Sequence, residues 1–244
     1  MNLKYYPKLL PEFINFLINP SIKSFIHLKS TERIANTAIL FIFRAFLSII
    51  FISVTKLVFG VGTISKNVGL EKYRDLYTPL TMFFIGALLL PFIEEIGFRL
   101  YLKFKPINLA LSIVVLSYYS LTKVVYNTYN TDINNQFTAR ILISLSIGSI
   151  AYLIILQYIY RIKVFWSKYF RWIYYFSCFS FALIHTLNYK LTLNDFLLVF
   201  ILTFPHLISG MVNGFIRIKY GFIYSFGSHF LNNSIVLILL LFLR

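Results

Sequence analysis

The chain has 244 residues, of which 59% are hydrophobic and only 13% are charged. Soluble domains average roughly 45–50% apolar and ~25% charged residues, so this composition excludes an ordinary soluble protein and predicts a polytopic membrane protein. The 23 lysines and arginines, set against 8 acidic residues, lie in short segments between apolar runs, where they face lipid headgroups. A nucleic-acid-binding surface is excluded, because it would need a large soluble face.

No stretch of the chain is polar enough to form a second domain. Residues 1–244 are therefore expected to form a single integral membrane domain, an all-α transmembrane helical bundle. Near its start, the sequence LLPEFINFLINP is too short to cross a bilayer and combines aromatic with polar residues, which is typical of an interfacial helix.

Apolar windows of ~20 residues, the length of a helix that crosses roughly 30 Å of hydrocarbon, predict about seven spans. The third window is short and ends in polar residues. If all seven cross, Glu94 in the second and His185 in the fifth lie near opposite membrane faces, whereas a third segment that does not cross brings them to the same side. The predicted spans are Ile34–Thr55, Leu76–Leu100, Ile107–Thr122, Ile141–Tyr160, Trp172–Tyr189, Phe196–Ile216 and Gly221–Leu243.

Lysines and arginines on the N-terminal side of these spans outnumber those on the opposite side. By the positive-inside rule, this distribution predicts a multi-pass protein of the cell membrane with a cytoplasmic N-terminus. The single cysteine, Cys178, falls in an apolar segment and is expected to be a small buried packing residue.

Two adjacent acids, Glu94 and Glu95, lie in the sequence PFIEEIGFRL at the end of the second apolar run. A charge in the membrane interior costs ~2.5–3.5 kcal/mol on insertion scales, so such residues indicate a functional site. Glu95 and Arg99 are four residues apart, acid first, which predicts an ion pair along one helix face. Glu94 is turned roughly 100° away from that face, and burial without such a partner makes it a candidate general base.

Two further polar positions lie inside apolar runs, His185 in FSFALIHT and His229 with Asn233 in FGSHFLNNS. His229 and Asn233 are four residues apart and therefore share a helix face. A glutamate and a histidine that share a water molecule, with a second histidine and an amide that donate to an oxyanion, make up a hydrolytic site. These residues predict a polar intramembrane cavity with that chemistry.

At these positions the chain resembles the CAAX prenyl-endopeptidase and bacteriocin-processing family (CPBP or Abi), a family of intramembrane glutamic proteases. The resemblance covers about Leu80 to the C-terminus. Leu100 departs from the glycine that often follows the motif arginine, and Asn232 duplicates the amide beside Asn233. The motif EExxxR is met by Glu94, Glu95 and Arg99, FxxxH by Phe181 and His185, and HxxxN by His229 and Asn233.

The resemblance implies peptide-bond hydrolysis without a metal or other cofactor. It implies that Glu94 and His185 activate water, and that His229 and Asn233 hold the oxyanion. Glu95 with Arg99 supplies a supporting ion pair. The implied partners are membrane lipids and a hydrophobic peptide substrate, such as a prenylated tail, a bacteriocin or pheromone leader, or the tail of a membrane protein.

Three alternatives stay open at this point. Glu94, His185 and His229 are residue types that bind Zn²⁺, although the chain has no HExxH motif and Asn233 would have no role as a zinc ligand. Some members of the resembling family are associated with bacteriocin self-immunity or act as membrane adaptors, and this chain could act in that way by binding without proteolysis, although immunity can also require proteolysis. A proton-relay transporter is disfavoured, because no inverted repeat is evident.

The remaining intramembrane polar groups have structural interpretations. His206 follows Pro205 and is expected to satisfy carbonyls that the proline leaves without a donor. Arg44, in the first span, either extends to the interface or pairs with a glutamate, and the sequence does not decide between the two. Phe181 is expected to pack against His185 and to set its orientation.

Overall fold

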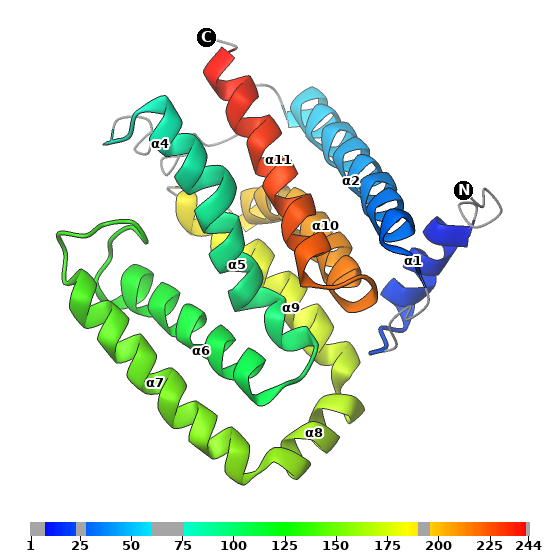
Figure 1. Cartoon of the computed structure of the whole chain (residues 1–244). Coiled ribbons are helices and arrows are strands. Elements are labelled where there is room, and N and C mark those ends of the chain that lie inside the picture. The colour runs from blue at the N-terminus through cyan, green and yellow to red at the C-terminus, as the bar shows by residue number, and fades with distance from the viewer. Residues whose placement is uncertain (1–7, 23–27, 60–75, 190–195, 243–244) are drawn as a thin grey trace.

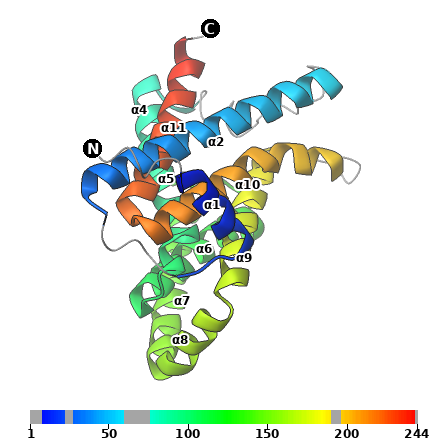
Figure 2. The same ribbon diagram turned by 90° about the vertical axis from the view of Figure 1, so that its right-hand side faces the viewer.

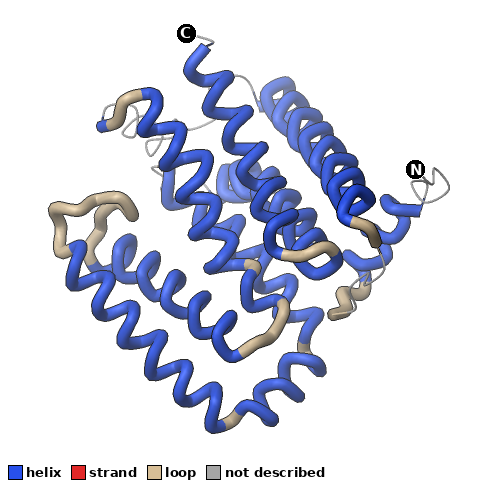
Figure 3. Tube along the Cα trace, viewed as in Figure 1, coloured by secondary structure: helices blue, strands red, loops and turns tan. Residues whose placement is uncertain are grey.

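The computed structural model describes residues 8–22, 28–59, 76–189 and 196–242, and every regular element within these ranges is a helix (Figure 3). Leu243, the last residue of the predicted final span, lies outside the described residues. The α-helices are α1 Leu9–Ile18, α2 Ser30–Phe59, α4 Pro79–Phe83, α5 Leu90–Phe98, α6 Pro106–Ser120, α7 Phe137–Gln157, α8 Ile159–Lys168, α9 Phe170–Ile184, α10 Phe196–Lys219 and α11 Phe222–Phe242.

Six helical stretches in the described part of the chain are long and apolar enough to cross a membrane. They agree with the predicted multi-pass helical bundle, and large apolar side chains cover their outer faces. The six are Ser30–Val58, Pro79–Leu102, Pro106–Val125, Phe137–Gln157, Leu198–Lys219 and Phe222–Leu240.

The prediction of seven full spans was wrong at the fifth segment, Trp172–Tyr189. Helix α9 has only 15 residues, a length of about 22 Å, and it ends at Ile184 in the 3-10 turn His185–Asn188. The side chains of His185 and Thr186 explain this end, because they bond the carbonyl oxygens of Phe181 and Leu183, each at 2.7 Å, in place of the next helical N–H groups.

The third predicted segment, in contrast, is a full-length span. Helix α6 continues through the π-helical turn η5, Leu121–Val125, and pairs closely with α7 as an antiparallel hairpin (Figure 1). By length and composition, the segment that falls short of a spanning helix is therefore α9 rather than α6.

The second span is irregular in its middle. Helix α4 passes through the π-helical segment η3, Phe84–Leu89, into α5, and a 3-10 turn η4, Leu100–Leu102, closes it. Pro91 lies in the first turn of α5. Since proline has no N–H, it removes one donor from this stretch of backbone.

Helix α10 lies in the centre of the bundle, with Val212, Phe215, Ile216 and Ile218 fully buried. Its first half extends to one side of the molecule, and Pro205 lies within it (Figure 2). At Gly221, φ is +119°, a conformation that favours glycine, and this residue forms the tight turn into α11.

Helix α1 is too short to span a membrane, as the sequence predicts, and it packs on the bundle. Its apolar side packs on the bundle, where Leu9, Phe13 and Phe16 are buried and the Phe13 ring lies edge-on to Phe215 at 5.3 Å. The Glu12 carboxylate lies 3.4 Å from the Lys219 ammonium of α10. The apolar side of α1 therefore contacts protein rather than lipid.

Candidate active site

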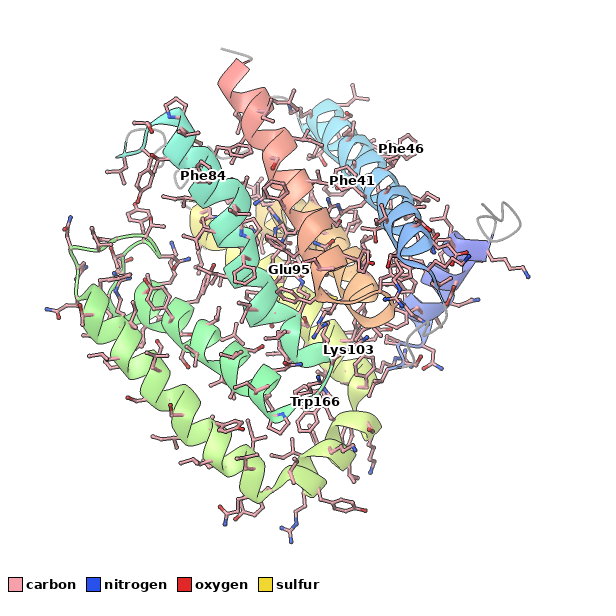
Figure 4. All side chains as sticks on the ribbon, viewed as in Figure 1. Phe41, Phe46, Phe84, Glu95, Lys103 and Trp166 are labelled. Atoms are coloured by element: carbon pink, nitrogen blue, oxygen red, sulfur yellow. The ribbon has the colours of Figure 1, made fainter. Side chains whose placement is uncertain are left out.

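Helix α5 carries the two adjacent glutamates toward α11, and Figure 4 shows Glu95 in the middle of the bundle. The Glu95 side chain is 0% exposed, whereas that of Glu94 is 15% exposed. The roughly 100° between successive residues on a helix accounts for this difference. One carboxylate is therefore enclosed and the other is accessible.

Glu95 is bound on several sides. Its Oε1 lies 3.6 Å from the Arg99 guanidinium, the ion pair that the spacing predicts. The Ser225 hydroxyl donates to its Oε2, and His229 Nδ1 donates to Oε1 at 3.0 Å. A buried carboxylate is stable only when it is paired in this way, so Glu95 is fixed in place.

Phe181 links three of the other residues. Its ring stacks beneath the Arg99 guanidinium at 3.5 Å, a favourable cation–π contact for a charge out of water. The same ring lies 4.7 Å from the His185 ring and 5.7 Å from the His229 ring. Phe181 thus brings α9 to the level of the site, and its ring packs against that of His185.

His229 of α11 lies between the two glutamates. Its Nδ1 bonds Glu95, and its Nε2 lies 3.5 Å from Glu94 Oε2. Because Glu95 accepts from Nδ1, the opposite ring nitrogen is directed at Glu94. A proton bound either to His229 Nε2 or to Glu94 Oε2 lies between these two atoms.

His185 is held by its own helix. Its Nδ1 lies 2.7 Å from the Phe181 carbonyl oxygen, which can only accept, so Nδ1 carries the proton and Nε2 has the free lone pair of the neutral ring. The His206 ring stacks on it at 3.8 Å with an interplanar angle of 20°.

This stacking was missed at the sequence level, because it joins residues on different helices. His206 makes ring contacts with His185 and Phe181, whereas the sequence predicted a bond to carbonyls freed by Pro205.

Asn233 lies one turn beyond His229 on α11, and its amide donates to the Gly86 carbonyl oxygen at 3.0 Å. That oxygen lacks a helical partner, because the Leu90 N–H bonds Ile85 instead and Pro91 has no N–H. Asn232 donates to the Asn233 amide oxygen at 3.3 Å. The second amide hydrogen of Asn233 is left for another acceptor.

Arg44 neither extends to the interface nor contacts a glutamate directly. Its guanidinium is buried between α2, α10 and α11, where it donates to Ser209 at 3.1 Å, to Asn213 Oδ1 at 3.4 Å and to the Ser228 carbonyl oxygen at 3.4 Å. The Ser225 hydroxyl lies between the Asn213 carbonyl oxygen, at 3.0 Å, and Glu95 Oε2, and these two acceptors share its one hydrogen. A chain of hydrogen bonds therefore joins Arg44 to the buried carboxylate.

The structure thus brings Glu94, Glu95, Arg99 and His229 into direct contact. It places His185 beside them through the Phe181 ring that both histidines touch, and Asn233 on Gly86 at the edge of this group. Within the described ranges, no group of three or more histidine, cysteine, aspartate or glutamate side chains is arranged to hold a metal ion. Two cavities are lined mainly by apolar residues, and neither includes Glu94, His185, His229 or Asn233.

Comparisons with known proteins give no match: no family model, no curated protein and no solved structure is similar to this chain. An activity therefore has to be argued from the geometry of these residues and from the motifs they form.

Proposed function

We propose that the protein is an intramembrane, metal-independent glutamic endopeptidase that hydrolyses a peptide bond of a membrane-associated or lipidated peptide. The observation that carries this proposal is the position of His229, 3.0 Å from Glu95 through Nδ1 and 3.5 Å from Glu94 through Nε2. An accessible carboxylate beside an oriented imidazole is an arrangement suited to general acid–base chemistry.

In the proposed reaction, Glu94 takes a proton from a water molecule as the water oxygen attacks the carbonyl carbon of the scissile bond. His185 Nε2, whose lone pair is free, accepts a hydrogen bond from the other O–H of the same water and orients it. The carbonyl oxygen becomes an oxyanion. When the C–N bond breaks, the proton held by Glu94 passes to the departing nitrogen, so that an acid and an amine are the products.

The oxyanion needs donors that are already in position. His229 donates through Nε2 when its ring is protonated on both nitrogens, because the Nδ1 hydrogen is given to Glu95. Asn233 keeps one amide hydrogen beyond the one it gives to Gly86. Glu95 and Arg99 take no part in bond breaking, since both are enclosed, and they hold the His229 ring in place.

The substrate class follows from the surroundings. The site lies among helices whose outer surfaces are apolar, so a substrate reaches it from the bilayer. Prenylated tails, bacteriocin or pheromone leaders and membrane-protein tails all have the required hydrophobicity.

The test is cleavage of candidate lipidated and leader peptides by purified protein, with Glu94→Gln as the variant. Glutamine has nearly the same shape and cannot act as a base, so the rate is expected to fall by about 10²–10⁴. Glu32→Gln is the matched control, since Glu32 contacts only the start of α2 in the described structure, and it should cleave like the wild type. Equal cleavage by the Glu94→Gln protein would rule out this mechanism.

A binding role without proteolysis is the alternative outcome. Immunity to a bacteriocin that survives Glu94→Gln, in a protein that is folded and inserted normally, would assign the chain to self-immunity or to an adaptor function.

A further inference from the structure

An apolar cavity lies between α6, α8 and α9, away from the glutamates. Its volume is about 560 Å³, within the range of roughly 300–1,000 Å³ that ligand sites have. Tyr101 and Trp166 lie at its buried side, and Figure 4 shows Trp166 where α8 approaches the rest of the bundle. On its outer side Trp172 and Phe176 are each 67% exposed. Such a hollow on a lipid-facing surface suits an apolar ligand from the bilayer.

Two cations lie beside aromatic rings that line this cavity, at its edge. Lys168 Nζ is 5.2 Å from the centre of the Tyr169 ring. The Arg171 guanidinium lies between two rings, 6.0 Å from the centre of Trp172 and 5.7 Å from that of Tyr175, which is outside the lining. Residues 159–171 also contain Arg161 and Lys163 and no acidic residue. This end of the cavity is therefore positively charged.

The cavity has a direction relative to the membrane. Helices α6 and α9 both begin at the end of the bundle where α8 lies, opposite the C-terminal end of α11 (Figure 1). The lining runs from Leu109 to Leu116 on α6 and from Tyr169 to Phe176 at the start of α9, roughly 10 Å along each helix. The cations lie at the start of α9 and the apolar lining continues along it. In a bilayer crossed by the neighbouring helices, this order matches the headgroup and acyl chain of a phospholipid.

We propose that this cavity binds an anionic glycerophospholipid from the leaflet on the N-terminal side of the membrane. An acyl chain lies among the aromatic rings, and the headgroup phosphate pairs with Lys168 and Arg171. A zwitterionic phospholipid fits the same hollow, but its own ammonium group competes for the phosphate, so it binds more weakly. The site is separate from the proposed catalytic residues and does not depend on them.

The chain itself provides the probe for this site. It contains two tryptophans, Trp166 and Trp172, and both line the cavity. Bromine atoms on an acyl chain quench tryptophan fluorescence on contact. The wild-type protein is reconstituted into phosphatidylcholine vesicles in which either brominated phosphatidylglycerol or brominated phosphatidylcholine replaces part of the lipid.

Phosphatidylglycerol is expected to bind on the order of tenfold more tightly, because each cation near the surface contributes ~1 kcal/mol to an anionic headgroup. The double variant Lys168→Gln, Arg171→Gln should lose most of this preference while phosphatidylcholine still quenches. The matched control Lys29→Gln, Arg33→Gln removes the same charge at the start of α2 and should keep the preference.

Equal quenching by the two brominated lipids in the wild type overturns the proposal. An equal loss of the phosphatidylglycerol preference in both double variants also overturns the proposal, because it indicates a general surface potential rather than a site. If the Lys168→Gln, Arg171→Gln variant does not reconstitute, quenching of the wild type by the two brominated lipids is measured again in high salt. Loss of the phosphatidylglycerol preference there supports the ion pairing, and an unchanged preference overturns it.

Discussion

The imidazole of His229 contacts two carboxylates that are adjacent in the sequence but enclosed to different degrees. Glu95 is held by Arg99 and Ser225, so its bond to Nδ1 fixes the plane of the ring. Glu94 has no such set of partners and remains 15% exposed. At the level of single residues, one glutamate orients the histidine and its neighbour is the one that can meet a substrate.

His206 is predicted to be a positioning residue for His185. The stacked ring restricts rotation of His185 about its side chain, and aromatic pairs of this kind contribute about 0.5–1.5 kcal/mol. His206→Leu should therefore lower kcat for peptide cleavage by about two- to tenfold with little change in KM.

The variant His206→Phe keeps an aromatic ring in the same place and should restore most of the rate. If leucine and phenylalanine lower kcat equally, stacking is not the property that matters. If neither changes it, His206 has no role in the reaction.

At the scale of helices, α9 and α10 approach so closely at position 210 that any side chain there would be crowded. A Cβ there would lie 3.2 Å from both the Cα and the carbonyl oxygen of Cys178, which is buried as the sequence predicts. Gly210→Ala is expected to destabilise the protein by about 1–3 kcal/mol, since backbone atoms cannot move aside.

The matched control is Gly227→Ala on α11, where nothing lies within 4 Å of the added carbon and alanine favours the helix. Thermal unfolding in detergent compares the two. A Tm for Gly210→Ala at or above that of Gly227→Ala would contradict the close packing of α9 on α10.

The ion pair between Glu12 of α1 and Lys219 of α10 is predicted to add less to the free energy of unfolding than its 3.4 Å distance suggests. Burial raises the pKa of the Glu12 carboxyl above its usual value, and Lys219 offsets this only in part. A raised pKa in the folded state means that the contribution to stability is present below the unfolded pKa and is lost as pH rises through the folded value. Glu12→Gln should therefore have a Tm at pH 7 equal to or above that of the wild type.

The difference between the two proteins should shrink as the pH falls below about 4.5, where the wild-type carboxyl is also neutral. Lys219→Gln is the companion variant, and it should melt lower than the wild type at pH 7 because it leaves the charged carboxylate of Glu12 without its cation. A clear drop in Tm for Glu12→Gln at pH 7 would show that the pair stabilises α1 after all.

At the scale of the whole molecule, hydrolysis is predicted to proceed without a metal ion. His229 Nε2 lies 3.5 Å from Glu94, so a zinc ion held by these two residues would have to separate them, and the described residues include no group of three arranged to hold a metal. Cleavage should be unchanged after exhaustive chelation and dialysis. Loss of activity that Zn²⁺ alone restores would require a different mechanism.

The sequence could predict the contacts of the site that form within a single helix. The spacing of Glu95 and Arg99 fixes their contact within one helix, and apolar windows fix six of the long helices. The spacing could not reveal the stacking of His206 on His185 or the partners of Arg44, because these contacts join separate helices. It also could not set the length of α9, since the apolar window continues past the residue where the side chains of His185 and Thr186 bond the last carbonyls.

The early end of α9 has a consequence for the bilayer itself. Peptide groups released from a helix within hydrocarbon cannot be left facing lipid tails, so they draw in either protein donors or solvent. A helix that ends after 15 residues therefore needs other donors at the depth of His185, and the His185 and Thr186 side chains supply two of them. In the proposed hydrolysis water has to reach this same depth, so the end of α9 is the place where its backbone groups attract both side-chain donors and solvent.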